Sequence, residues 1–216
     1  MSSFILKIIA LIAMTFDHTG KVLLFNNEIL LNIGRIAFPL FAFQIVEGYH
    51  HTKNIKKYLL RLLIVALFAQ FAYSQFFDGF NTIFTLIIGL ICIIIIDKEK
   101  DIPIKISLLL TIFLLSLILN IDYGLIGVLI IICFYLFRNN KIKRSMLFSL
   151  LVIISYGITY FQNPEFSYII NLFATLSSLI FINLYNNKQG PKLKYLFYIY
   201  YPLHLYILWI IQVLIK

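Results

Sequence analysis

The sequence predicts an all-α fold, a polytopic transmembrane bundle of about nine helices with the N-terminus in the cytoplasm and the C-terminus outside. Three observations support this prediction: the composition, the lengths of the apolar runs, and the distribution of Lys and Arg between the loops. Of the 216 residues, 62% are hydrophobic and 12% are charged, and the mean hydropathy is +0.95. Soluble domains carry about 25% charged residues. The composition therefore indicates an integral membrane protein.

The apolar runs supply the elements in order, and most approach the roughly 20 residues that a helix needs to span a bilayer. They cover residues 4–25, 29–47, 58–77, 82–97, 103–121, 122–137, 145–161, 166–185 and 194–215. The fourth and sixth runs are short, and the fifth and sixth meet at the sequence LNIDYG with almost no loop. Eight helices are therefore the alternative to nine.

The loops between the runs differ in charge. Lys and Arg follow the second, fourth, sixth and eighth runs, whereas the alternate loops carry acidic residues, namely Glu28, Asp78, Asp122 and Glu165. The positive-inside rule places the basic loops and the N-terminus in the cytoplasm. Nine helices preserve this alternation, and the loss of any one helix would break it.

The same distribution explains the net charge of +9 and the pI of about 9.5, which in a soluble chain would indicate a nucleic-acid binder. We expect a lipid bilayer as partner and no nucleic acid. No linker, low-complexity tract or repeat divides residues 1–216, so one integral-membrane domain is predicted. The first run carries polar residues and lacks a small-residue cleavage site, so we expect a retained helix and no cleaved signal peptide.

The first run contains polar residues in its interior, in the stretch LIAMTFDHTGKVLLF. Asp17, His18 and Lys21 lie within it. An Asp, Lys or Arg near the middle of a membrane helix costs about 2.5–3.5 kcal/mol and normally faces the bundle interior or a wet cavity. Asp17 and Lys21 are four residues apart, so they share a helix face and can partly neutralise each other.

The second run, NIGRIAFPLFAFQIVEGYHHT, adds Arg35 in its outer half. Pro39 removes the amide that would have bonded the Arg35 carbonyl, so a kink is predicted there. Because the first hairpin is tight, Arg35 should lie at the depth of Asp17 and His18, and it is a candidate partner of Asp17. The alternative role for these charges is to hold the helices in register.

The last run, KYLFYIYYPLHLYILWIIQVLIK, places His204 one turn from Pro202, near the middle of the span. A single membrane histidine is often a packing residue. Two imidazoles beside prolines or charges, at opposite ends of one chain, are a more specific sign of a functional site than a single histidine. Together with the pKa range of histidine, they suggest an intramembrane reaction site.

Several of these segments resemble the TraX family of membrane proteins, named after a conjugative-plasmid protein that acetylates the pilin N-terminus. The resemblance is carried by MTFDHTGKVL, GRIAFPLFAFQIVEGYHHT, KYLLRLL, NTIFTLIIGL, DYGLIGVL, LYNNKQG and KYLFYIYYPLHL. It implies a multi-pass acetyltransferase of the bacterial cytoplasmic membrane that uses acetyl-CoA as acyl donor. It also implies a distant similarity to integral-membrane acyltransferases, in which an early-helix histidine is catalytic; His18 matches that position.

An amine acceptor is largely protonated at neutral pH, so acetyl transfer needs a base. His18 is the candidate base, and His204 is the second catalytic candidate. Asp17 is first a charge partner of Lys21 or Arg35 and second an orienter of His18, while Arg35 or Lys21 could stabilise the oxyanion. Glu47 and Tyr201 are the substrate-binding candidates.

Coenzyme A would bring its phosphates to the cytoplasmic face, where basic residues are abundant. Positive-inside topology explains the same charges without a ligand. The candidate cofactor-binding residues are Lys21, Lys53, Lys56, Lys57, Arg61, Lys188, Lys192 and Lys194.

No metal site is predicted. Cys92 and Cys133 lie inside predicted spans, where they are expected to be apolar fillers, and His50 and His51 lack a further ligand at suitable spacing. The chain has no phosphate-binding G-x-x-x-x-G-K-[ST] and no H-E-x-x-H, which argues against an ATP-driven pump and a zinc protease.

Two other function classes stay open. A secondary transporter or proton-coupled permease would use broken helices and buried charges equally well, but it predicts an internal repeat that the sequence does not show. A noncatalytic scaffold or immunity protein predicts that His18 is dispensable. The sequence does not identify the acceptor, which is a peptide amine such as that of pilin, another amine, or a hydroxyl.

Overall fold

The computed structural model describes residues 1–191 and 193–215, with only the backbone of Lys194. Helices account for 79% of this part, and it contains no β-strand, only one isolated bridge between Phe80 and Ile121. The helices are α1 (Ser3–Val22), α2 (Glu28–Gly34), α3 (Ala37–His51), α4 (Ile55–Tyr73), α5 (Thr82–Lys98), α6 (Ile102–Ile118), α7 (Gly124–Leu136), α8 (Lys141–Gln162), α9 (Phe166–Asn183) and α10 (Lys194–Ile215).

The predicted count of about nine helices is confirmed for the described chain, because α2 and α3 are two parts of one apolar segment, Glu28–His51. The interruption falls at Arg35 and Ile36, at the position where Pro39 removes a backbone donor. The closely spaced fifth and sixth spans are also separate helices. Tyr123 and Gly124 adopt positive φ values of 63° and 49° and turn the chain between them.

The helices suit a membrane environment. Five segments of the described chain are long and apolar enough to cross a bilayer: Ser3–Val22, Glu28–His51, Lys141–Gln162, Phe166–Asn183 and Tyr195–Ile215. Helices α6 and α7 are apolar but shorter. Along α6 only Ser116 is buried, so the large apolar side chains of this helix face outward, as a lipid-exposed helix requires. The chain is therefore a membrane protein.

Polar residues at the ends of the apolar runs determine where several helices begin. The side chains of Asn54, Asn81 and Asn140 accept hydrogen bonds from backbone N–H groups in the first turns of α4, α5 and α8. Asp101 does the same for α6. Such caps satisfy donors that have no partner inside the helix.

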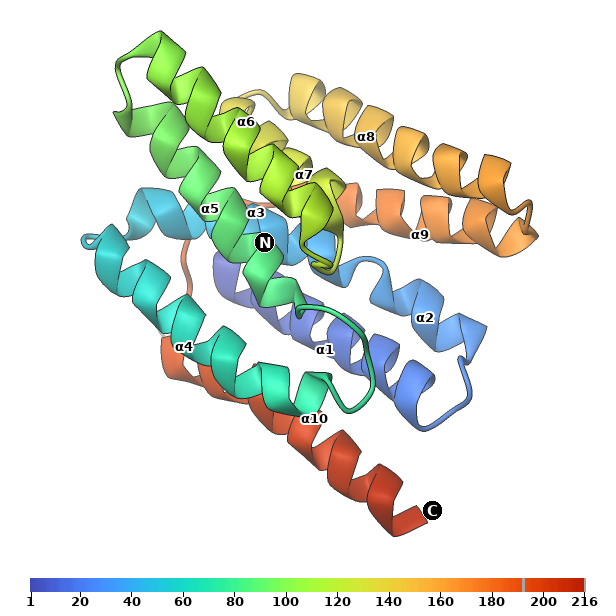
Figure 1. Ribbon diagram of the computed structural model, residues 1–216. Helices are drawn as coiled ribbons and strands as arrows, with labels where there is room; N and C mark the ends of the chain where they lie inside the picture. Colours follow the sequence, from blue (N-terminus) through green and yellow to red (C-terminus); the bar gives the residue numbers. More distant parts are fainter. Residues whose placement is uncertain (192, 216) are drawn as a thin grey trace.

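Helix α3 lies at the centre of the bundle and contacts α1, α5, α7 and α9. Figure 1 shows α8 and α9 paired on one side and α4 and α10 paired on the opposite side, with α1 and α3 between the two pairs. Helix α4 buries Ala66, Ala69 and Ala72 completely. Small side chains of this kind let membrane helices approach closely.

The basic loops meet at one end of the bundle, which we call the basic end. There the Asp97 carboxylate of α5 accepts hydrogen bonds from the hydroxyls of Tyr49 in α3 and Tyr135 in α7. Lys141 of α8 donates to the Asn183 carbonyl of α9. The N-terminal residues join the loop after α9 through backbone hydrogen bonds, Ser3 to Lys188 among them. Spatial grouping of these loops agrees with the charge alternation along the sequence.

We expect cysteine labelling in intact cells to find Asn54 and Asn140 on the cytoplasmic side and Asp78 and Asn163 on the outer side. The first two precede α4 and α8 at the basic end, and the second two lie at the opposite end of the bundle. The positive-inside rule assigns the basic end to the cytoplasm. Labelling of Asn54 and Asn140 from opposite sides would contradict the nine-helix topology.

Candidate functional site

A cavity of about 450 Å³ runs between α1, α3, α4, α5 and α10, and the loop after α9 also lines it. Its lining includes Ser3 at the first turn of α1 and Lys21 at the last. At 1.5 Å per residue this stretch of α1 is about 27 Å long, close to the thickness of the hydrocarbon core. The cavity therefore extends from the basic end toward the opposite end of the bundle.

Two imidazoles meet beside this cavity. His18 of α1 and His204 of α10 place Nδ1 and Nε2, respectively, 2.7 Å apart, and their rings are nearly parallel. Each residue is only 6% exposed. His18 lines the cavity, whereas His204 does not. The two candidate catalytic histidines, 186 residues apart in sequence, therefore form one hydrogen-bonded pair.

When both rings are neutral, a backbone carbonyl determines which nitrogen of each ring carries the hydrogen. Nδ1 of His204 lies 3.1 Å from the Tyr200 carbonyl, which can only accept, so this nitrogen carries a hydrogen. Nε2 of His204 is then an acceptor, and Nδ1 of His18 donates to it. Nε2 of His18 keeps a lone pair. Such a group is suited to act as a base toward a molecule in the cavity.

Asp17 is paired with Lys21, and its carboxylate lies 2.5 Å from the Lys21 ammonium. Both residues line the cavity. Of the two predicted partners of Asp17, the structure thus selects Lys21. The other candidate, Arg35, donates from Nε to the Asn171 side chain of α9 at 2.8 Å and does not line the cavity. The short α2 directs Arg35 toward α9, so the structure does not place it at the predicted oxyanion site.

Helices α1 and α2 approach each other closely at Gly34. A Cβ atom at this position would collide with the Asp17 side chain and backbone. Gly34 therefore makes the close contact with Asp17, while the adjacent Arg35 binds a different helix, α9. No local pattern distinguishes this arrangement from an Asp17–Arg35 pair.

Asp122 is a site residue that the loop-charge pattern did not reveal. It lines the far end of the cavity, where its carboxylate accepts a hydrogen bond from Thr82, and its carbonyl accepts one from Thr85. In the sequence Asp122 is one of four acidic loop residues. One sequence feature could have indicated this site. Thr82 and Thr85, three residues apart at the start of α5, place two hydroxyls on one helix face, where they can bind a polar residue.

The basic end of the cavity carries two cations, Arg61 and Lys7. Arg61 donates to the Tyr198 hydroxyl at 3.3 Å, and the Lys7 ammonium lies 5.4 Å from the Phe197 ring. Gln44, 6% exposed, also lines this part; Ser3 donates to its Oε1, but its Nε2 has no hydrogen-bond partner in the described chain. Buried donors of this kind normally require an acceptor.

Tyr201, predicted to bind substrate, also lines the cavity and is 7% exposed. Its hydroxyl lies beside Thr82 but forms no hydrogen bond of standard geometry with the described residues. It is therefore a buried donor at the cavity wall, with Thr82 as its nearest polar neighbour.

The predicted cofactor-binding residues separate into groups. Arg61 lines the cavity at its basic end, whereas Lys21 lines it at the opposite end. Four of the predicted lysines are exposed and do not line it: Lys53, Lys56, Lys57 and Lys188. Lys192 and the side chain of Lys194 lie outside the described residues.

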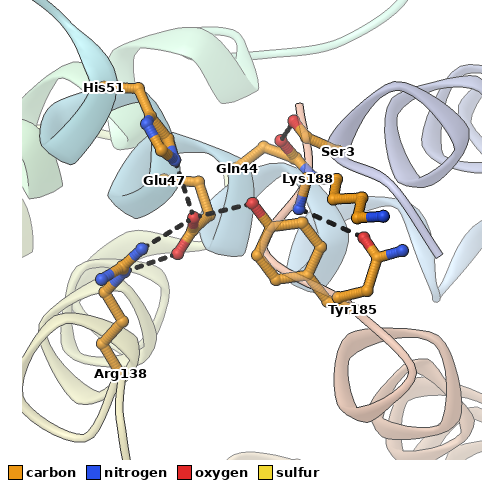
Figure 2. Close-up of polar contacts among 8 residues, drawn as sticks. Ser3, Gln44, Glu47, His51, Arg138, Tyr185 and Lys188 are labelled. Atoms are coloured by element: carbon orange, nitrogen blue, oxygen red, sulfur yellow. Dashed lines mark hydrogen bonds and ion pairs between the residues drawn. The ribbon is translucent and has the colours of Figure 1, made fainter. Parts of the chain in front are cut away.

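Glu47, the other residue predicted to bind substrate, lines the larger cavity but already has protein partners (Figure 2). Nε and Nη2 of Arg138 donate to its two oxygens at 2.7 and 3.1 Å, and the Tyr185 hydroxyl donates at 2.9 Å. Nε2 of His51 lies 3.5 Å away. The hydrogen bond to Glu47 raises the pKa of the Arg138 guanidinium. Glu47 is 2% exposed and joins α3 to the segments that follow α7 and α9.

Metal ligands do not cluster in the described part of the chain, where no group of three His, Cys, Asp or Glu residues could hold an ion. Cys92 and Cys133 are buried and unpaired, as expected for small apolar residues. His50 stacks on Tyr135 at the basic end.

Comparison with known proteins gives two matches. The family model described as TraX protein matches residues 2–212. The probable fimbrial assembly protein FimC, serogroup H1, from Dichelobacter nodosus is 29% identical over 241 aligned residues, which cover 96% of this chain and 94% of that protein. No solved structure matches the chain.

Proposed function

The chain belongs to the TraX family, and from this premise we propose that it is an integral-membrane acetyltransferase. It would transfer an acetyl group from acetyl-CoA on the cytoplasmic side to an amine presented at the membrane. Because the relative is named as a fimbrial assembly protein, we further propose a pilus-related acceptor, a pilin N-terminus being the first candidate.

The observation that carries this proposal is the His18–His204 pair at the wall of a cavity that extends along most of α1. A base at this place could serve a donor that enters from the basic end and an acceptor that enters from the other. A noncatalytic scaffold has no need for paired imidazoles beside an open cavity, since buried polar groups are costly.

The chemistry can be written with this chain's own groups. Nε2 of His18 first removes the extra proton of the acceptor ammonium and releases it to water. The neutral amine then attacks the thioester carbonyl carbon, and Nε2 of His18 takes a second proton from the nitrogen as the carbon–nitrogen bond forms. The carbon–sulfur bond breaks, an amide forms, and the proton held by His18 returns to the departing thiolate. The Tyr201 hydroxyl and the Lys21 ammonium are the cavity donors suited to stabilise the oxyanion of the tetrahedral intermediate.

The basic end has features that suit coenzyme A. Arg61 and Lys7 would attract its phosphates, and Nε2 of Gln44 is a buried donor without an acceptor, suited to an amide carbonyl of the pantetheine arm. Lys7 and His18 are separated by about 16 Å along α1. A thioester carried on an extended arm could bridge this separation.

The opposite end has features that suit a cationic acceptor. Asp17, Lys21 and Asp122 line it together, so the carboxylates outnumber the ammonium by one. A protonated amine would be attracted there before it loses its proton to His18. This charge balance favours an amine over a neutral hydroxyl as acceptor.

The binding of acetyl-CoA tests the proposal. We expect millimolar acetyl-CoA to raise the melting temperature of the detergent-purified protein, because a ligand that binds only the native state stabilises it by mass action. Arg61→Gln should reduce this shift. Lys56→Gln, on the same helix but exposed and away from the cavity, is the matched control and should leave the shift unchanged.

A transfer assay excludes the transporter alternative. Label from acetyl-CoA should appear on a pilin-derived peptide with a free N-terminus and not on the same peptide with a blocked N-terminus. A transporter could bind a ligand in this cavity but would not move label to a second molecule. No melting shift and no labelled acceptor would together refute the proposal.

A further inference from the structure

A second cavity, of about 150 Å³, opens at the basic end among the ends of α3, α7, α8 and α9. Arg138, Lys141 and Arg144 line it, with Glu47 as its acidic residue. Arg138 already binds Glu47, so two cations are left without a carboxylate partner within the described chain. The rim residues Asn139 and Lys141 are exposed, which leaves the cavity open to the surroundings.

Arg144 makes this cavity unusual. It is 3% exposed, Nη1 donates to the Arg138 carbonyl at 3.1 Å, and Nη2 donates to the Asn183 side chain at 2.9 Å. Its Nε has no hydrogen-bond partner in the described residues, and the guanidinium lies over the Phe43 ring. A buried cation without an anion is costly, so a bound anion would compensate both the charge and the free N–H.

We propose that this second cavity binds a phosphate group. Arg and Lys side chains are the usual ligands of phosphate oxygens, and Arg144 lies in the first turn of the 22-residue helix α8, where the helix dipole favours an anion. The cavity far exceeds the roughly 10–15 Å³ that admits one water molecule. Basic pockets between helix ends at the cytoplasmic surface suit phospholipid headgroups, and a soluble phosphate offers the same chemistry.

The inference does not depend on the acetyltransferase proposal, because none of the three basic residues lines the larger cavity. It can fail while acetyl transfer is confirmed, and the reverse also holds.

Melting temperatures of the full-length protein test the proposal and identify the source of the phosphate. One arm adds inorganic phosphate to protein in detergent, against sodium chloride at equal ionic strength. The other arm compares phosphatidylcholine nanodiscs with and without phosphatidylglycerol. A ligand at about ten times its Kd should raise the melting temperature by roughly 3–6 °C.

Three variants make the result specific. Arg144→Gln and Lys141→Gln should each weaken binding about tenfold, the typical effect of losing one charged hydrogen bond. Lys143→Gln is the matched control, since Lys143 is exposed on the same helix turn and does not line the cavity. If Arg144→Gln fails to fold, the melting shifts of Lys141→Gln and Lys143→Gln, both changes of exposed residues, decide whether phosphate binds in this cavity.

A shift with inorganic phosphate that Lys141→Gln reduces and Lys143→Gln keeps would support a soluble phosphate. The same pattern with phosphatidylglycerol alone would support a lipid headgroup. The absence of a shift in both arms, or an equal response of all variants, would overturn the proposal.

Discussion

Replacing His18 by Ala is expected to lower the rate of acetyl transfer by at least about two orders of magnitude, the lower end of what general base catalysis contributes. The variant should still insert and fold, because the change removes a polar group whose burial is itself unfavourable. Initial rates with labelled acetyl-CoA and a free-amine peptide give the effect on activity. The melting temperature of the same preparation gives the effect on folding.

His204 supplies the control for this experiment. It does not line the cavity, so we treat it as a positioning residue that holds the tautomer and orientation of His18. His204→Ala should lower the rate about 10- to 100-fold, in keeping with the loss of one buried hydrogen bond. His204→Gln should restore part of it, because a side-chain carbonyl can still accept from Nδ1 of His18. Full activity in His18→Ala would disprove the mechanism.

Replacing Arg138 by Ala is expected to destabilise the folded protein by about 3 kcal/mol, at the lower end of the 3–5 kcal/mol typical for removing one partner of a buried ion pair. Glu47 is 2% exposed and would keep a carboxylate bonded only to Tyr185 and near His51. The free energy of unfolding in a denaturing detergent series provides the measurement. Lys143→Ala, an exposed change at the same end, should have little effect.

A second substitution separates lost charge compensation from lost packing. In the double variant Glu47→Gln with Arg138→Met, no charge is buried, so stability should recover toward the wild type. If the single and double variants are equally unstable, the Arg138 contribution is packing of its side chain rather than its charge.

Local sequence patterns determined the fold class, the count of about nine helices and the position of the helix break before Pro39. Each of these depends on residues close together in the chain: apolar runs of the length of a bilayer, caps at their ends, and a missing amide in one turn. The Asp17–Lys21 pair was also predictable, since two residues four apart lie on the same helix face wherever the helix packs.

Contacts between helices were decided by the tertiary structure. His18 and His204 could be recognised as candidates, but their 2.7 Å contact depends on how α1 and α10 are rotated about their axes. Arg35 was predicted to lie at the depth of Asp17 as its candidate partner, but the direction of α2 sends it to Asn171. Periodicity gives the faces of a helix but not the neighbour that each face meets, because that neighbour is selected by packing of the whole bundle.

The same reason explains which basic residues line a cavity. Positive-inside topology places Lys53, Lys56, Lys57, Arg61, Arg138 and Arg144 at one end of the bundle, without distinguishing among them. Only the packed helices direct Arg61 into the larger cavity, pair Arg138 with Glu47 and bury Arg144 beside the smaller one. Charge along the chain determines the side of the membrane, and the rotation of each helix determines whether that charge meets lipid, water, a carboxylate or a ligand.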